Sequence, residues 1–278
     1  MSYLQTGNKF LRVGKQNVAY RELGRGRSNY PLVMLVHLAA TMDNWDPKLV
    51  DLLAKKQHVI LVDLPGVGAS KGKVARTIPA MAEQVIQFIE VLGYAKVNLL
   101  GLSMGGMIAQ EVVRQDGDLV NKLILVGTGP RDGIGIDKVT SKTFEYILRA
   151  RRDKEDPKRY IFYAHDEDGK KVADQVLGRL ASRKEDFQDS KMTVSSFLRQ
   201  LRAIKRWSRS GEDDLSFIQQ DTLIVNGDDD KMVATENSRI LNERLVSSHL
   251  YLYPKAGHGS LFQYPELFSQ QVHEFLEE

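Results

Sequence analysis

The chain contains 278 residues, of which 42% are hydrophobic and 27% charged, and its formal net charge is +3. This composition is typical of a soluble globular protein, and the length allows one large domain or a domain that carries an insertion. The absence of cysteine excludes a disulfide framework, a thiolate nucleophile and a Cys-ligated metal, and it fits a cytoplasmic protein. No apolar stretch approaches the ~20 residues that a membrane-spanning helix needs, so we expect no membrane partner.

The first half of the chain alternates between predicted strands and predicted helices. Residues 9–13 and 18–23 flank a turn at 14–17, which predicts a hairpin. Short, continuous apolar runs then predict strands buried on both faces, and residues 78–92 carry apolar side chains at helical spacing. In chain order, we predict strands at 32–36, 58–62, 97–100 and 122–126, and helices at 48–56, 78–92 and 107–114. Strands that alternate with helices indicate an α/β fold with a parallel, helix-covered sheet.

The alternation stops after residue 130, and the periodicity is helical until residue 210. Strands return at 222–226 and 249–253, with helices at 236–244 and 265–276. We therefore predict an α/β core, residues 1–130 and 211–278, and a helical cap, residues 131–210, inserted after the sixth strand. The cap carries 20 basic and 13 acidic residues, a net charge of +7 on a body of −4. This surplus indicates either a solvated helical surface or a lid that attracts anions.

One pentapeptide, Gly101-Leu102-Ser103-Met104-Gly105, matches the pattern G-x-S-x-G. It directly follows a predicted strand and opens a predicted helix, and an ordinary strand-to-helix turn with a capping serine is the alternative reading. The pattern is typical of a nucleophile elbow, in which a sharp turn lifts the serine hydroxyl clear of the sheet. The N–H groups at the start of the new helix would face negative charge that develops there. Ser103 is therefore the candidate nucleophile.

A serine hydroxyl needs a base to take its proton, and a histidine base needs a carboxylate to orient it. His258 lies between two glycines just after the strand at 249–253, at the carboxyl end expected for a site in a parallel sheet. His37 ends another strand on the same side and is the only rival. Asp228, Asp229 and Asp230 follow the strand at 222–226, where a solvated turn or a weak calcium site is the alternative reading. The order Ser, Asp, His is that of α/β-hydrolases.

With these motifs in place, the chain resembles the α/β-hydrolase superfamily, near its haloperoxidase-like, carboxylesterase-like branch of serine hydrolases. The segments that carry the resemblance are residues 36–40 with 43–45, 63–70, 101–106, 226–233 and 256–259. The resemblance implies a mostly parallel, eight-stranded sheet flanked by helices. It also selects Asp230 as the acid, because the family's acid usually lies three residues after the glycine and three before the valine. The predicted catalytic triad is Ser103, His258 and Asp230.

The resemblance also implies an oxyanion hole made of backbone N–H groups. The two donors would be Met104, directly after the serine, and Ala39, in the loop after the third strand. Relatives usually have glycine after the loop histidine, whereas this chain reads His37-Leu38. If that position needs a positive φ, leucine would be strained there. Alternatively, the loop takes another path, or Leu38 lines the substrate pocket, for which Trp45 is the second predicted residue.

These residues predict a serine hydrolase that acts on a small carboxylic ester or related acyl substrate, which could be anionic. The same triad leaves open perhydrolysis (metal-free haloperoxidase chemistry), thioester or lactone hydrolysis, and carbon–carbon bond cleavage. A ligand-binding, receptor-like protein with a residual triad is the alternative of another class. We expect no cofactor, no metal and no nucleic-acid partner, since the basic stretches at 149–152 and 199–209 contain only one aromatic residue, Trp207. The sequence does not fix the oligomeric state, and a homo-oligomer is compatible with it.

Overall fold

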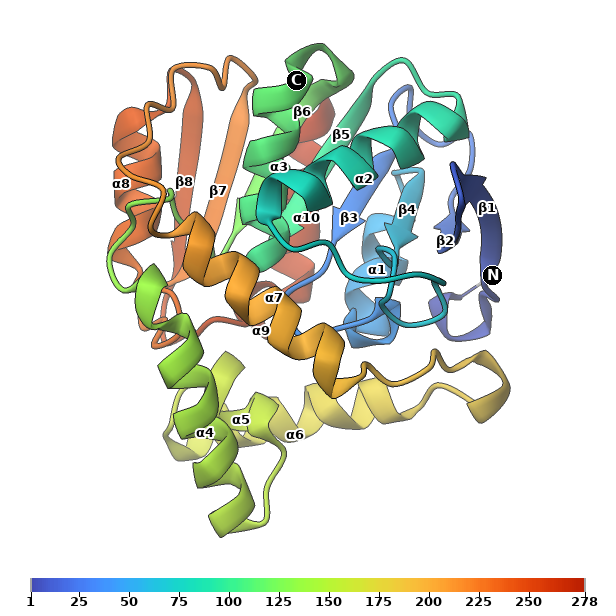
Figure 1. Ribbon diagram of the computed structural model, residues 1–278. Coiled ribbons are helices and arrows are strands. Elements are labelled where there is room, and N and C mark those ends of the chain that lie inside the picture. The colour runs from blue at the N-terminus through green and yellow to red at the C-terminus, as the bar shows by residue number, and fades with distance from the viewer. Residues whose placement is uncertain (1, 278) are drawn as a thin grey trace.

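A single twisted sheet runs through the centre of the molecule (Figure 1). The computed structural model describes residues 2–277. The strands are β1 (Lys9–Val13), β2 (Gln16–Leu23), β3 (Leu32–Leu35), β4 (Val59–Val62), β5 (Val97–Leu102), β6 (Val120–Val126), β7 (Thr222–Gly227) and β8 (Ser248–Tyr253). Their order across the sheet is β1-β2-β4-β3-β5-β6-β7-β8. β2 is antiparallel to both of its neighbours and every other pair is parallel, which confirms the predicted eight-stranded, mostly parallel sheet.

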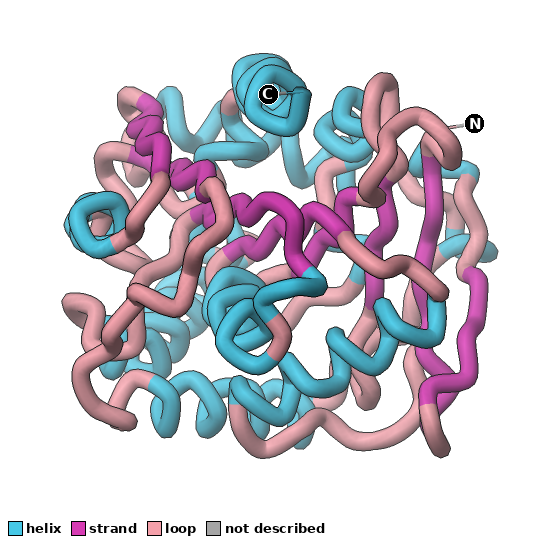
Figure 2. Tube along the Cα trace, turned by 90° about the horizontal axis from the view of Figure 1, so that it is seen from above, coloured by secondary structure: helices cyan, strands magenta, loops and turns pink. Residues whose placement is uncertain are grey.

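Helices cover both faces of this sheet, as the view from above shows (Figure 2). One face packs against α2 (Ile78–Leu92) and α3 (Met104–Gln115). The other face packs against α1 (Pro47–Leu53), α9 (Ser260–Gln263) and α10 (Pro265–Glu277). The remaining core helix, α8 (Glu236–Arg244), contacts β7 and β8. No helix within residues 2–277 combines the length and the apolar character needed to cross a membrane.

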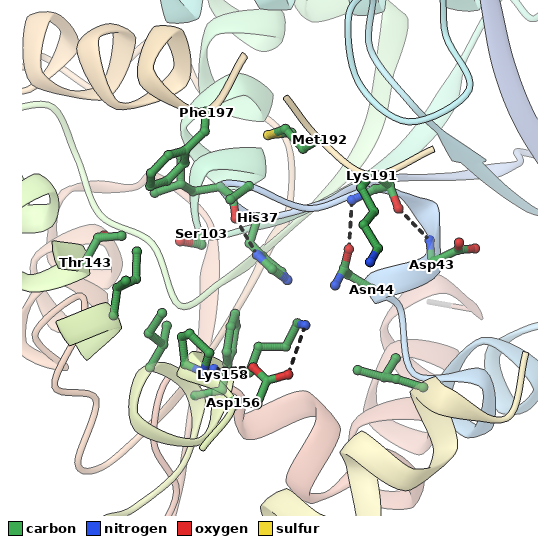
Figure 3. A pocket seen from close by; sticks show the side chains of 18 of the residues that line it. His37, Asp43, Asn44, Ser103, Thr143, Asp156, Lys158, Lys191, Met192 and Phe197 are labelled. Carbon is green, nitrogen blue, oxygen red and sulfur yellow. Dashed lines mark hydrogen bonds and ion pairs between the residues drawn. The ribbon is translucent and has the colours of Figure 1, made fainter. Parts of the chain in front are cut away.

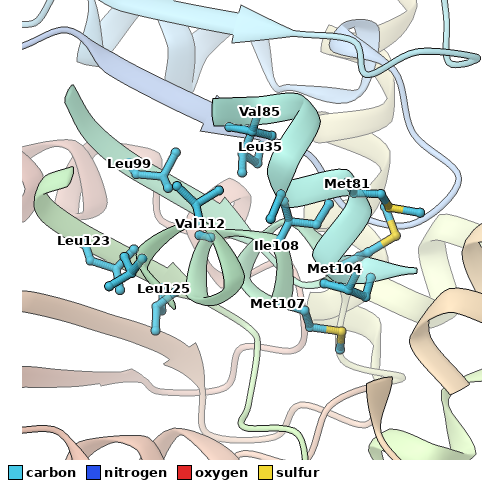
Figure 4. Close-up of a cluster of buried hydrophobic side chains, with 14 of the residues drawn as sticks. Leu35, Met81, Val85, Leu99, Met104, Met107, Ile108, Val112, Leu123 and Leu125 are labelled. Atoms are coloured by element: carbon cyan, nitrogen blue, oxygen red, sulfur yellow. The ribbon is translucent and has the colours of Figure 1, made fainter. Parts of the chain in front are cut away.

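The hydrophobic core has two halves, one on each side of the sheet. Successive strand residues point to opposite faces, so Val33 and Leu35 belong to one half while Leu32 and Met34 belong to the other. Figure 4 shows the first half, where side chains of α2 and α3 meet those of β3, β5 and β6. Because both faces are covered at the centre of the sheet, β3 and β4 consist of continuous apolar residues that are all buried.

Four α-helices separate β6 from β7 in the chain: α4 (Val139–Asp153), α5 (Pro157–Phe162), α6 (Glu167–Ala181) and α7 (Val194–Trp207). We keep the name cap for residues 131–210, and their division from the core as a separate domain remains a prediction. In Figure 1, α4, α5 and α6 lie below the sheet and α7 runs obliquely back toward it. Three buried side chains of α7, Ala203, Ile204 and Trp207, belong to the same core half as α2 and α3.

Two features of the core differ from the sequence expectations. The helix predicted at 107–114 begins three residues earlier, at Met104, directly after Ser103. A histidine on an amphipathic closing helix would be expected at the surface, whereas His273 of α10 is buried. Its side chain is only 9% exposed and its Nε2 lies 3.3 Å from the Leu52 carbonyl oxygen, because α10 packs against α1.

Candidate active site

Ser103 stands at a sharp bend between β5 and α3. Its backbone has φ 57° and ψ −116°, a conformation that non-glycine residues rarely adopt. The flanking glycines are required by close packing, since a Cβ at Gly105 would collide with the carbonyl of Leu35 and one at Gly101 with the carbonyl of Gly105. The Ser103 N–H donates to the Val126 carbonyl oxygen over 2.8 Å, which holds the bend against β6. This is the geometry of a nucleophile elbow.

Three side chains from separate loops meet at this bend. His258 Nε2 lies 2.9 Å from Ser103 Oγ, and His258 Nδ1 lies 2.7 Å from Asp230 Oδ2. The Asp230 carboxylate only accepts hydrogen bonds, so it favours the histidine tautomer with the proton on Nδ1. Nε2 then carries the free electron pair and accepts from the serine hydroxyl. All three residues are buried, with exposures of 8%, 2% and 5% for Ser103, His258 and Asp230.

Each partner is held in place by its own loop. Asp230 follows β7, and its Oδ1 accepts hydrogen bonds from the N–H groups of Met232 (2.8 Å) and Val233 (2.9 Å). His258 lies in the loop between β8 and α9, where the Gly259 N–H donates to the Phe162 carbonyl oxygen of α5 over 2.7 Å. Phe162 also packs against the imidazole, with ring centroids 5.4 Å apart. The cap therefore supports the loop that carries the histidine.

The neighbouring aspartates make other contacts. Asp229 pairs with Lys231, and the Asp228 carboxylate accepts from the Ala256 N–H at 3.4 Å. Of the three aspartates considered as the acid, Asp230 is the one bonded to His258. Within residues 2–277, no group of three or more histidine, cysteine, aspartate or glutamate side chains is arranged to hold a metal ion.

The rival histidine, His37, faces the cavity next to the triad (Figure 3). Its Nδ1 lies 2.8 Å from the Leu38 carbonyl oxygen, so Nδ1 carries the proton. Burial lowers the pKa of His37 to about 3, and the hydrogen bond to Leu38 opposes that shift only in part. The imidazole is therefore neutral at physiological pH, packed 4.6 Å from the Phe162 ring.

The two predicted oxyanion donors differ in their surroundings. Met104 is the first residue of α3, so its N–H belongs to the free amide end of that helix. Ala39 has φ 61°, which places the left-handed residue of the loop one position after Leu38. The Ala39 N–H donates to the side-chain oxygen of Gln200, on α7, over 2.9 Å. Sequence reasoning missed Gln200, which is 161 residues away and carries no motif.

A cavity of about 1040 Å³ opens over Ser103 and His258 (Figure 3). Part of its wall is apolar and comes mainly from the cap, with Ile147, Ile161, Phe162, Leu177, Met192 and Phe197. Another part is charged, with Asp43, Asp156, Lys158, Arg183, Asp189 and Lys191. Leu38 and Ala39 line the cavity as well. The structure places Trp45 away from it, because its indole is 1% exposed and packs edge-on against Phe262 in the core.

Comparisons with known proteins agree with this architecture. A family model for the alpha/beta hydrolase fold matches residues 30–265. A solved α/β-hydrolase fold protein from Chitinophaga pinensis is 33% identical, covers 100% of both chains and superposes with a TM-score of 0.92.

Two curated relatives have assigned activities. The 2-hydroxy-6-oxo-6-(2'-aminophenyl)hexa-2,4-dienoic acid hydrolase of Metapseudomonas resinovorans is 26% identical over 280 residues, covering 96% of this chain and 90% of the relative. The pimeloyl-[acyl-carrier protein] methyl ester esterase of Pectobacterium carotovorum is 26% identical over 261 residues, covering 89% and 94%. The two relatives are thus a hydrolase and an esterase. Because the family model matches most of the length of this chain, the chain belongs to the α/β-hydrolase fold family.

Proposed function

We propose that the chain is a serine hydrolase that cleaves a small carboxylic ester or a related acyl substrate. The observation that carries the proposal is the continuous hydrogen-bonded series from Asp230 through His258 to Ser103. Its distances of 2.7 and 2.9 Å lie within proton-transfer reach. The series opens into a cavity large enough for a small organic substrate.

In the proposed reaction, Ser103 Oγ attacks the substrate carbonyl carbon while its proton passes to His258 Nε2. Asp230 stabilises the imidazolium that forms. The N–H groups of Met104 and Ala39 hold the negative oxygen of the tetrahedral intermediate. His258 then returns the proton to the leaving alcohol, which departs and leaves an acyl-enzyme. A water molecule, deprotonated by the same histidine, releases the carboxylic acid and regenerates the serine.

A fluorophosphonate probe tests this proposal and separates an enzyme from a ligand-binding protein. Such a probe phosphonylates an activated serine, so we expect stoichiometric labelling of the wild-type chain and none of Ser103→Ala. We also expect Asp230→Asn to lower kcat for p-nitrophenyl acetate by about 10³–10⁴, because an amide favours the wrong histidine tautomer. Asp229→Asn is the matched control and keeps its activity. A folded wild-type chain that neither labels nor turns over the ester refutes the proposal.

Carbon–carbon bond hydrolysis is the second candidate, favoured by similarity to the dienoic acid hydrolase over 96% of this chain. It would use the same triad on a ketone rather than an ester. A substrate panel separates the candidates: activated esters, thioesters and lactones on one side, and a vinylogous 1,5-diketone on the other. Peroxide-dependent halogenation, assayed on the same preparation, tests perhydrolysis. The ester proposal predicts the highest kcat/KM for an ester.

A further inference from the structure

The N–H of Ala39, the second proposed oxyanion donor, already has an acceptor. Gln200 Oε1 receives it at 2.9 Å, a normal length for such a bond. Gln200 is itself buried, with 3% of its surface exposed. An N–H group forms one well-aligned hydrogen bond at a time. An acyl oxygen that accepts from the Ala39 N–H must therefore take the position that the Gln200 oxygen occupies.

The helix that carries Gln200 is fixed on both sides of it. Before Gln200, Ser196 Oγ donates to the Gly66 carbonyl oxygen over 2.8 Å. After it, Trp207 Nε1 donates to Glu111 Oε1 over 2.8 Å, and Glu111 also binds Arg131. Because α7 is bonded to the core at both places, releasing Ala39 requires a rotation of the glutamine side chain rather than a displacement of the helix.

The two oxygens that compete for Ala39 differ in charge. A substrate carbonyl in the ground state is a neutral acceptor, much like the glutamine amide, and gains little by displacing it. The oxygen of the tetrahedral intermediate is negative, and hydrogen bonds to ionised acceptors are roughly twice as strong as neutral ones. Displacement of Gln200 is therefore favoured when the intermediate forms, which makes the Ala39 donor selective for the transition state over the bound substrate.

We propose that Gln200 is a gate on the oxyanion site: its carboxamide oxygen occupies the Ala39 N–H in the resting protein and gives way to the acyl oxygen during reaction. This inference rests on the proposed function. It assigns Gln200 as a positioning residue that sets when the second donor becomes available. The gate slows the reaction because the hydrogen bond between the Ala39 N–H and Gln200 Oε1 must first be broken.

Two substitutions at this position change the gate in opposite directions. Gln200→Met keeps the length of the side chain and removes the amide oxygen, so Ala39 is free in the resting protein. In the wild type the neutral hydrogen bond from Ala39 to Gln200 must be broken, which slows the reaction about three- to tenfold. We therefore expect Gln200→Met to raise kcat/KM for p-nitrophenyl acetate and the rate of fluorophosphonate labelling by that factor. Gln200→Glu supplies a charged acceptor that holds the N–H more strongly, and we expect both rates to fall at least about tenfold at neutral pH.

The control is Gln175→Met, the same substitution at an exposed position of α6, with circular dichroism to verify that each variant is folded. If Gln200→Met lowers both rates in a folded protein while Gln200→Glu retains them, Gln200 only braces the loop and the gate is overturned. Unchanged rates in both variants overturn it as well. If neither the wild type nor Gln200→Met reacts with either reagent, the serine-hydrolase proposal itself has failed, and the gate fails with it.

Discussion

At the scale of single residues, the site depends on two backbone positions that are unfavourable for their side chains. Ser103 and Ala39 both have positive φ, 57° and 61°, although neither is glycine. Such positions cost of order 1–3 kcal/mol each and persist only where the surroundings fix them. The Ser103 N–H is bonded to β6 and the Ala39 N–H to α7. The strain is therefore located at the proposed nucleophile and at a proposed oxyanion donor.

His37 illustrates how a buried titratable residue affects the stability of the whole chain. Its pKa falls from an ordinary 6.5 to about 3 in the folded protein, chiefly because burial removes the charged form from water. Between these two values the unfolded chain binds a proton that the folded chain does not. Stability must therefore decrease as pH falls below 6.5, by about 1.4 kcal/mol for each pH unit.

A variant that cannot titrate should remove this dependence. His37→Asn keeps a donor toward the Leu38 carbonyl oxygen and has no pKa in this range. Between about pH 7 and pH 5, we expect the wild type to lose about 2 kcal/mol more unfolding free energy than the variant loses. Urea denaturation of both proteins at the two pH values measures the difference. Equal losses in the two proteins would mean that His37 is protonated in the folded state.

At the scale of elements, the ion pair between Arg179 and Asp46 joins the cap to the core. Arg179 of α6 contacts both oxygens of Asp46, with its Nε at 2.8 Å from Oδ1 and a terminal nitrogen at 2.6 Å from Oδ2. Asp46 is fully buried and also caps α1, accepting from the Lys48 N–H at 3.0 Å. The Arg179 side chain is 28% exposed, so solvent weakens the pair only in part.

Loss of the arginine would leave a buried carboxylate without its partner. We expect Arg179→Met to lower the unfolding free energy by about 2–4 kcal/mol. Arg179→Lys should lose less, because lysine keeps the positive charge, but it should not reach the wild-type value, because an ammonium group cannot bind both oxygens of Asp46 as the guanidinium does. Lys170→Met, at an exposed position of the same helix, is the control and should change stability by less than about 0.5 kcal/mol. Chemical denaturation of the three variants tests this. A loss no larger than the control's would show that the pair contributes little.

Elements with strong local signals could be predicted from the sequence, and the others depended on long-range packing. Helix α2 was predicted from end to end because its apolar side chains recur at helical spacing. In the structure Thr77 caps its start and Gly93, at φ 83°, ends it. The apolar pattern of α3 starts only at residue 107, because Gly105 and Gly106 carry no side chain and disfavour a helix locally, although the G-x-S-x-G motif predicts a helix that opens there. The reason for these two glycines appears only in the folded structure, where a Cβ at Gly105 would collide with Leu35 and one at Gly106 would collide with Thr128. The short α9 carries too little pattern to be predicted at all.

The candidate site divides in the same way. Ser103 and His258 could be named because each follows a strand of a parallel sheet, whose carboxyl ends meet at one edge. The same argument led only to the group Asp228, Asp229 and Asp230, and the family resemblance selected Asp230 among them. Leu38 was predicted on the cavity wall and lies there, but most of the wall could not be predicted, because it comes from cap helices whose pairing is not encoded locally. Trp45 was predicted on that wall, yet its large apolar side chain is buried in the core. Gln200 is one polar residue on an amphipathic helix, where its contact with Ala39 has no sequence signal.

At the scale of the whole molecule, a basic cap covers a mildly acidic body, whereas the charged side chains on the cavity wall balance, with three acidic and three basic residues. Most charged groups on its wall are already paired. Asp43 binds Arg21 and Arg183, Asp189 binds Arg21, and Lys158 lies 3.7 Å from Asp156. Lys191 lines the cavity and takes part in no ion pair within residues 2–277. Its ammonium group, drawn in Figure 3, is thus the cation available to a substrate.

A substrate that carries a carboxylate should therefore react better than a neutral ester of the same length. For p-nitrophenyl hemisuccinate against p-nitrophenyl butyrate, we expect the ratio of kcat/KM values to fall about two- to fivefold in Lys191→Gln. Raising the ionic strength from about 0.01 M to about 1 M should lower the wild-type ratio in the same way, because exposed charges are screened over a shorter distance. Lys170→Gln, on an exposed part of α6, controls for the general loss of positive charge. A ratio that responds neither to salt nor to the loss of Lys191 would mean that the basic cap is only a solvated surface, and that the acyl group is recognised by the apolar wall alone.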